Sequence, residues 1–136
     1  MSKKTVLLSV FMLALAYVMV FNYGGCGSSS DSGSSVTVSA PSNLSGTLSA
    51  ITLGYNIMLT WQDNSNNETN FNLYAKSYDA TSWTLCSSAI PASATSYGFP
   101  SNTLGGSGSS FQFCLTAYDS DDSKESAASN IVTLSW

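Results

Sequence analysis

Apolar and polar residues alternate along most of the chain after residue 36, as expected for strands that bury one face. β-branched and aromatic side chains recur in these stretches, and clusters of Gly, Asn, Asp, Pro and Ser separate them. The alternating stretches are residues 43–48, 56–61, 71–76, 82–86, 95–99, 111–117 and 130–136. The pattern therefore predicts seven short strands and no helix in this part of the chain.

Each of these strands has only one apolar face, so a single sheet would leave that face in water. Two antiparallel sheets packed face to face cover it most economically. About 100 residues are enough for one such domain and not for two. We therefore expect an all-β fold over residues 37–136, an antiparallel two-sheet β-sandwich of about seven strands.

The first 25 residues have a different pattern, which is typical of an export signal. Two lysines precede the 16-residue apolar run Val6–Phe21, and two glycines lead from Tyr23 to Cys26. The Gly-Gly-Cys order resembles a bacterial lipobox, which implies that Cys26 is acylated and becomes the first residue of the mature chain. The lipoprotein family usually has Leu at the position of Tyr23.

Three outcomes remain open for this segment. Residues 1–25 are removed and Cys26 is lipidated, an ordinary signal peptidase releases a free secreted domain, or the apolar run stays as an anchor. The run is short of the about 20 residues that span a bilayer core. Residues 26–36 predict a flexible Gly/Ser-rich tether. In lipoproteins, a residue other than Asp after the cysteine directs export outward, so Gly27 implies an outer-membrane or cell-surface location in the cell envelope.

Charge and composition exclude several classes of function. After Cys26 the chain has two lysines against eight acidic residues, a net charge of −6, and it contains no arginine or histidine. A nucleic-acid partner is excluded because it requires a basic surface. Without histidine there is no Ser-His-Asp triad and no Cys-His nucleophile pair. We expect no enzyme activity and no cofactor.

Most of the mature chain resembles the fibronectin type III family in its bacterial form. The segments that carry the resemblance are APSNL at 40–44, LTWQDNS at 59–65, NETNFNL at 67–73, ATSY at 94–97, residues 111–117 and SN at 129–130. The resemblance implies that Trp61 packs between the sheets. It also implies a tyrosine corner, but Phe111 stands at that position and lacks the hydroxyl.

Two cysteines remain after Cys26, and an even number in an oxidising compartment suggests a disulfide between Cys86 and Cys114. The family's strand order places another strand between them. Two strand spacings approach 10 Å, beyond the roughly 7 Å that a disulfide allows between Cα atoms. Both a disulfide and two separate thiols therefore stay open.

Two acidic loops contain the candidate residues for metal binding and for acid–base catalysis. Asp119, Asp121 and Asp122 are the only candidate metal ligands, but the EF-hand spacing fails after them, which favours a solvated turn. Asp63 and Glu68 lie in one hydrophilic loop with no apolar residue between them. We expect their side chains to bond to local backbone rather than to catalyse hydrolysis.

Outward-facing aromatic residues are the candidate binding face: Tyr74, Trp83 and Tyr118. Tyrosines on sheets also serve simple cross-strand packing. Together with the resemblance, these residues predict a non-catalytic, lipid-anchored interaction or structural module with an unknown protein or glycan partner. The alternatives are a carbohydrate-binding accessory module, since bacterial domains of this family often accompany polysaccharide-degrading enzymes, and a subunit of an extracellular assembly.

Overall fold

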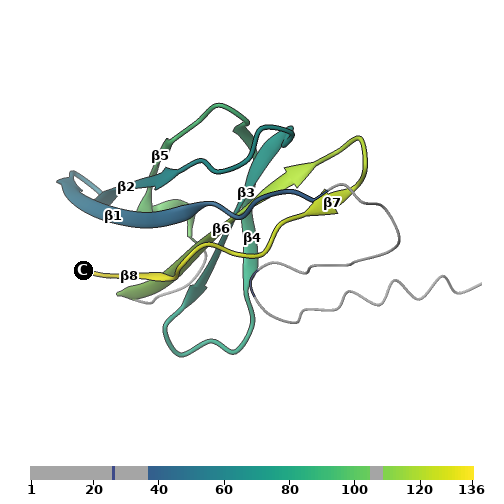
Figure 1. Cartoon of the computed structure of the whole chain (residues 1–136). Helices are drawn as coiled ribbons and strands as arrows, with labels where there is room; N and C mark the ends of the chain where they lie inside the picture. The colour runs from purple at the N-terminus through teal and green to yellow at the C-terminus, as the bar shows by residue number, and fades with distance from the viewer. Residues whose placement is uncertain (1–25, 27–36, 105–108) are drawn as a thin grey trace, which may run out of the picture.

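The computed structural model describes Cys26, residues 37–104 and residues 109–136. The expectations for residues 1–25 and 27–36 lie outside these described residues. The elements are β1 (Ser42–Ile51), β2 (Gly54–Gln62), β3 (Asn70–Ser77), β4 (Thr84–Pro91), β5 (Ser96–Pro100), the 3-10 helix η1 (Ser101–Thr103), β6 (Ser110–Asp119), β7 (Lys124–Glu125) and β8 (Val132–Ser135) (Figure 1). In the described part of the chain, no helix is long and apolar enough to cross a membrane.

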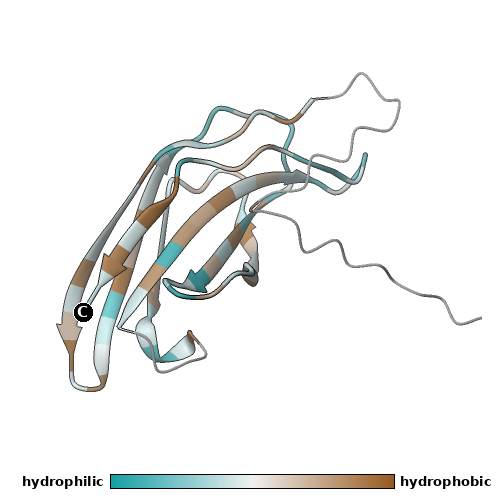
Figure 2. Cartoon of the chain, turned by 90° about the horizontal axis from the view of Figure 1, so that it is seen from below, coloured by the Kyte–Doolittle hydropathy of each residue, from teal (hydrophilic) through white to brown (hydrophobic). Residues whose placement is uncertain are grey.

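The strands form two antiparallel sheets. One has the order β1-β2-β5, and the other has the order β4-β3-β6-β7, with β8 also paired to β6. Hydrophobic and hydrophilic residues alternate along the strands, so each sheet has an apolar and a polar face (Figure 2). The predicted two-sheet β-sandwich is therefore confirmed.

The core lies between the two sheets and contains the apolar side chains that the alternation placed on one face. Its main residues are Ile57, Leu59 and Trp61 from β2, Phe71, Leu73 and Ala75 from β3, and Phe111, Phe113, Leu115 and Ala117 from β6. Trp61 is only 6% exposed, and its ring meets the Phe71 ring edge-on at 5.5 Å between centroids. The expected place of Trp61 between the sheets is confirmed.

The last strand, β8, is shorter than the predicted 130–136, and the segment before it pairs with β6 through side chains. The backbone N–H of Ser126 donates to the Ala117 carbonyl, and the Ser126 hydroxyl accepts from the Ala117 N–H. Ser129 makes the same two bonds with Leu115. These hydroxyls replace backbone carbonyls, so β6 keeps its hydrogen bonds between β7 and β8 without a regular strand beside it.

One side of the sandwich, between β1 and β8, is closed. The Asn130 side chain accepts from the Leu44 N–H and donates to the Leu44 carbonyl, at 2.8 Å each. A Cβ added to Gly46 would lie 2.9 Å from a Leu134 methyl group, so a larger side chain would require a shift there. Leu134 thus packs directly against the backbone of β1.

Candidate functional site

The outer face of the five-stranded sheet carries the predicted aromatic residues, but they do not form one platform. Tyr74 on β3 lies opposite Cys114, whereas Tyr118 lies opposite Asn70. Four residues of strand separate these two positions, a distance of about 13 Å. Trp83 precedes β4, and the Lys76 ammonium lies 5.3 Å from its ring centroid. All three aromatic side chains are half-buried.

A polar cluster occupies the same face, centred on Glu125 of β7. Its Oε1 atom accepts hydrogen bonds from the Tyr74 hydroxyl at 2.7 Å, the Thr116 hydroxyl at 2.6 Å and the Asn72 amide at 3.0 Å. Asn70 in turn donates to the Asn72 side chain at 2.9 Å. We call Asn72, Tyr74, Thr116 and Glu125 the Glu125 cluster. It joins β3, β6 and β7, and its one signal in the sequence was a charge at the end of a polar turn.

The environment of Tyr74 suppresses its ionisation. Burial, followed by the hydrogen bond to Glu125 and the charge of that carboxylate, raises the pKa of Tyr74 well above its ordinary range. The side chain is therefore a neutral donor at physiological pH. A group with a raised pKa in the folded state stabilises the fold below its unfolded pKa and loses that contribution as the pH rises further.

The Tyr74 pKa gives a prediction for alkaline pH. The free energy of unfolding should fall as the pH rises above about 10, the pKa of tyrosine in an unfolded chain. Tyr74→Phe should be less stable near neutral pH, because it loses the bond to Glu125, but its stability should fall less steeply above that pH. Urea unfolding of both proteins across the alkaline range measures the two slopes. Parallel slopes would contradict the assignment to Tyr74.

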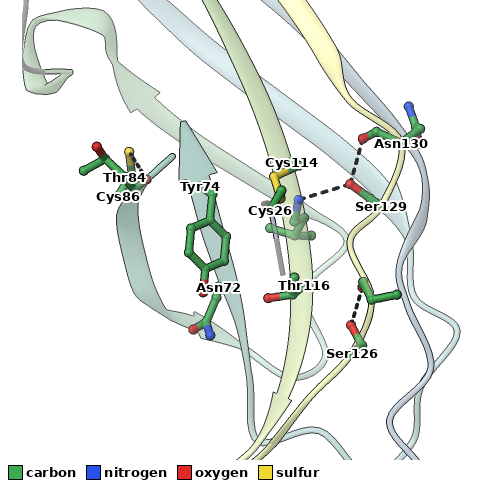
Figure 3. The surroundings of a disulfide bond; sticks show 12 residues. Cys26, Asn72, Tyr74, Thr84, Cys86, Cys114, Thr116, Ser126, Ser129 and Asn130 are labelled. Carbon is green, nitrogen blue, oxygen red and sulfur yellow. Dashed lines mark hydrogen bonds between the residues drawn. A yellow bond between two sulfur atoms is a disulfide. The ribbon is translucent and has the colours of Figure 1, made fainter. Parts of the chain in front are cut away.

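The cysteine pairing differs from the one considered from the sequence. Cys26 is bonded to Cys114, with 6.5 Å between their Cα atoms, and Cys86 is free and exposed (Figure 3). The bond between Cys86 and Cys114, one of the two alternatives left open by the sequence, is not formed, because β3 lies between their strands. Cys114 points to the outer face of the sheet, yet it is fully buried. Cys26, the first residue of the predicted tether, therefore lies against the outer surface of β6.

The bond to Cys114 bears directly on the acylation predicted for Cys26. A thioether to lipid and a disulfide both require the same Cys26 sulfur atom, so one chain molecule carries one or the other. If Cys26 carries lipid, Cys114 keeps a free thiol on β6. The two states differ in mass and in membrane attachment, and both differences are measurable.

The acidic turn after β6 uses its first carboxylate for local hydrogen bonds. Asp119 is 6% exposed and accepts from the backbone N–H groups of Asp121 and Asp122, at 2.9 and 3.5 Å. Within the described ranges, no three acidic or cysteine side chains converge as a metal ion requires. The candidate metal ligands Asp119, Asp121 and Asp122 are therefore not brought together, because Asp119 faces the turn backbone.

The loop after β2 is also held by local bonds, as expected for Asp63. Its carboxylate accepts from the Ser65 N–H at 3.0 Å, and the Asn64 amide donates to the Ala40 carbonyl at 2.8 Å. Glu68 has one buried carboxylate oxygen without a hydrogen-bond partner among the described residues. The two acids do not form a paired acid and base. The hydrogen bonds of the loop instead hold the segment at Ala40, before β1, close to the end of β2.

The side of the sandwich opposite β1 and β8 contains two adjoining hollows between β4 and the segment of β5 and η1. Their volumes are about 390 and 430 Å³. Both are lined by Cys86, Thr103 and Leu104, and Lys76 is the only charged residue in either lining. The alternation of apolar and polar residues cannot reveal these hollows, because they lie between strands of two different sheets.

No family model and no curated protein matches this chain. Several solved structures, however, match its fold. An Fn3-like protein from Clostridium thermocellum is 19% identical, covers 73% of this chain and 93% of its own, and superposes with a TM-score of 0.55. A structure described as a myokine is 15% identical over 73% of this chain and 97% of its own, with a TM-score of 0.52.

A third similar structure is the glycoside hydrolase domain of Endo-D from Streptococcus pneumoniae R6. It is 19% identical over 76% of this chain, but the match spans only 16% of that protein, with a TM-score of 0.52. Identities this low report on the fold and not on activity. These superpositions show that the chain has a fibronectin type III-like fold.

Proposed function

We propose that this chain is an exported, non-catalytic protein of the cell envelope, held at a membrane by lipid on Cys26. Its single fibronectin type III-like domain then acts as an interaction or structural module at the surface. The observation that carries the proposal is the order of the first 26 residues, in which two lysines, an apolar run and a Gly-Gly-Cys sequence precede one such domain.

The physical basis of anchoring is the burial of acyl chains. Each buried CH₂ contributes about 0.8 kcal/mol, and one chain alone binds a membrane only marginally. Bacterial lipoproteins carry two or three chains, which makes attachment stable. Glycine and serine between Cys26 and the domain would let the sandwich move near the membrane surface. An outer-membrane or cell-surface location agrees with Gly27 after the cysteine.

The absence of catalysis is also part of the proposal. The chain has no histidine, and the described acids Asp63 and Asp119 are engaged in hydrogen bonds to nearby backbone. Carbohydrate binding through Tyr74 and Tyr118 has less support, because the Tyr74 hydroxyl is bonded to Glu125 and the two rings lie apart on the sheet. Binding of a protein partner through strand edges or loops fits the fold better.

The decisive experiment is the intact mass of the chain extracted from its native envelope, together with membrane fractionation. Lipidation predicts a chain that begins at Cys26 and carries diacylglycerol and acyl mass. Cys26→Ala should move the protein almost completely from the membrane to the soluble fraction.

Cys114→Ala is the matched control, because it removes the disulfide partner and leaves Cys26 available. It should stay in the membrane fraction like the wild type. An unacylated chain that is about 2 Da lighter than its reduced form would carry the Cys26–Cys114 bond instead, and would overturn lipid anchoring.

A further inference from the structure

Few charged residues lie on one side of the sandwich. From Ala80 to Tyr118 there is no aspartate, glutamate, lysine, arginine or histidine. This stretch contains β4 and β5, the strands that end the two sheets on the side of the hollows. Most of the described acids lie in the loop after β2 and in the turn between β6 and β7. Asp79 in the β3–β4 turn and Lys76, which lines one of the hollows, border the uncharged stretch. We call the side formed by β4 and β5 the neutral side.

That neutral side has an open strand edge. β4 pairs with β3 along one edge only, and in the described part of the chain no strand faces its other edge. Edge strands expose unpaired N–H and C=O groups and are usually protected by charges, prolines, bulges or covering segments. β4 has no charge across its eight residues, and its one proline is the last of them. The opposite side, between β1 and β8, is closed by Asn130 and Leu134.

The surface of β4 has one feature that favours contact with another strand, an exposed leucine, and one that limits it, a bulge. Leu85 is 49% exposed, which is unusual for a large apolar side chain on an edge. Cys86 is the extra residue of a bulge, because Leu73 pairs with Ser87 while Tyr74 pairs with Leu85. The bulge leaves the Cys86 side chain exposed, although partial burial raises the pKa of its thiol.

We propose that β4 is a self-association edge, at which two copies of this chain pair antiparallel and join their β4–β3–β6 sheets into one. Two copies with a net charge of −6 repel each other, and this neutral side is where they approach with the fewest acids between them. Antiparallel pairing of identical strands is also self-complementary about a two-fold axis. A charged partner would gain no electrostatic attraction at this edge. The inference holds whether or not Cys26 carries lipid.

Cys86 provides a direct probe of this pairing. Directly opposed residues of an antiparallel pair lie about 4.5–5.5 Å apart at Cα, so thiols near the two-fold axis come within reach of a short bis-maleimide. The reagent is added to envelope preparations of the full-length protein, slightly above neutral pH because the thiol pKa is raised. We expect a product of twice the monomer mass, linked through Cys86 in peptide maps and absent in Cys86→Ala.

Two matched variants separate pairing at β4 from random collision. Leu85→Lys places a charge on the β4 edge and should lower the crosslinked yield about tenfold. Ile131→Lys changes a similarly exposed side chain, 53% against 49%, away from β4 and should leave the yield unchanged. Ser88→Lys, at another exposed position on β4, should act like Leu85→Lys and covers the case in which Leu85→Lys unfolds.

Sedimentation velocity of the purified protein completes the test without a crosslinker. The wild type and Ile131→Lys should sediment as dimers, and the two β4 variants as monomers. A monomeric wild type would overturn the inference, as would equal yields from the β4 variants and Ile131→Lys. Crosslinking of Cys86 to a different protein would also overturn it and assign the edge to that partner.

Discussion

Phe113→Ala should lower the free energy of unfolding by about 3–5 kcal/mol, the range for removing a large aromatic side chain from a packed core. Phe113 is fully buried at the centre of β6. Its ring lies 6.0 Å from the Phe99 ring of the opposite sheet and 6.4 Å from the Phe111 ring, measured between centroids. The substitution leaves a cavity where the two sheets meet.

Urea unfolding followed by tryptophan fluorescence measures this loss. A domain of this size is typically stable by about 5–15 kcal/mol, so the variant should remain only marginally folded. Tyr78→Ala is the control, because Tyr78 is 61% exposed and its removal should change stability by less than about 0.5 kcal/mol. Equal effects of the two substitutions would contradict the place of Phe113 in the core.

Glu125→Ala should lower the free energy of unfolding by about 2–4 kcal/mol, because it leaves several donors without an acceptor. Thr116 is fully buried and Asn72 is 7% exposed, so water replaces the carboxylate poorly. Tyr74 loses the same partner. β7 has only two residues, so much of its attachment to the sheet depends on this side chain.

Glu125→Gln should cost less than Glu125→Ala, since its amide oxygen still accepts a hydrogen bond. Asp122→Ala removes an exposed acid from the same turn and should have little effect. A double-mutant cycle between Glu125 and Thr116 isolates the energy of their contact. Additive losses in that cycle would show that the two residues act independently and would contradict a cooperative cluster.

Seven of the eight strands could be located from the sequence to within five residues at each end, because each depends on local alternation, whereas the two-residue β7 was not predicted. Ile57, Leu59 and Trp61 alternate with polar neighbours, and all three are buried in the structure. The end of the chain was the exception. Ser126 and Ser129 bond to β6 through their hydroxyls, and a polar residue that replaces a strand partner looks like any loop residue in a sequence.

The candidate site was predicted less well than the fold. Tyr74, Trp83 and Tyr118 were placed on one sheet, but their spacing along it and the bond from Tyr74 to Glu125 depend on the registers of β3, β6 and β7. The cysteines show the same limit. The strand order already argued against a bond between Cys86 and Cys114, but nothing local indicated that Cys26 lies against Cys114.

Local sequence was thus enough to determine that the part of the chain after Cys26 is acidic and that it forms a two-sheet β-sandwich with Trp61 in its core; the export-type leader stays a prediction. These properties follow from neighbouring residues and from composition. The pairing of Cys26, the acceptor role of Glu125 and the neutral open edge at β4 were decided only by the assembled sheets. Each depends on which strands become neighbours, and β6 brings together residues that are far apart in the chain.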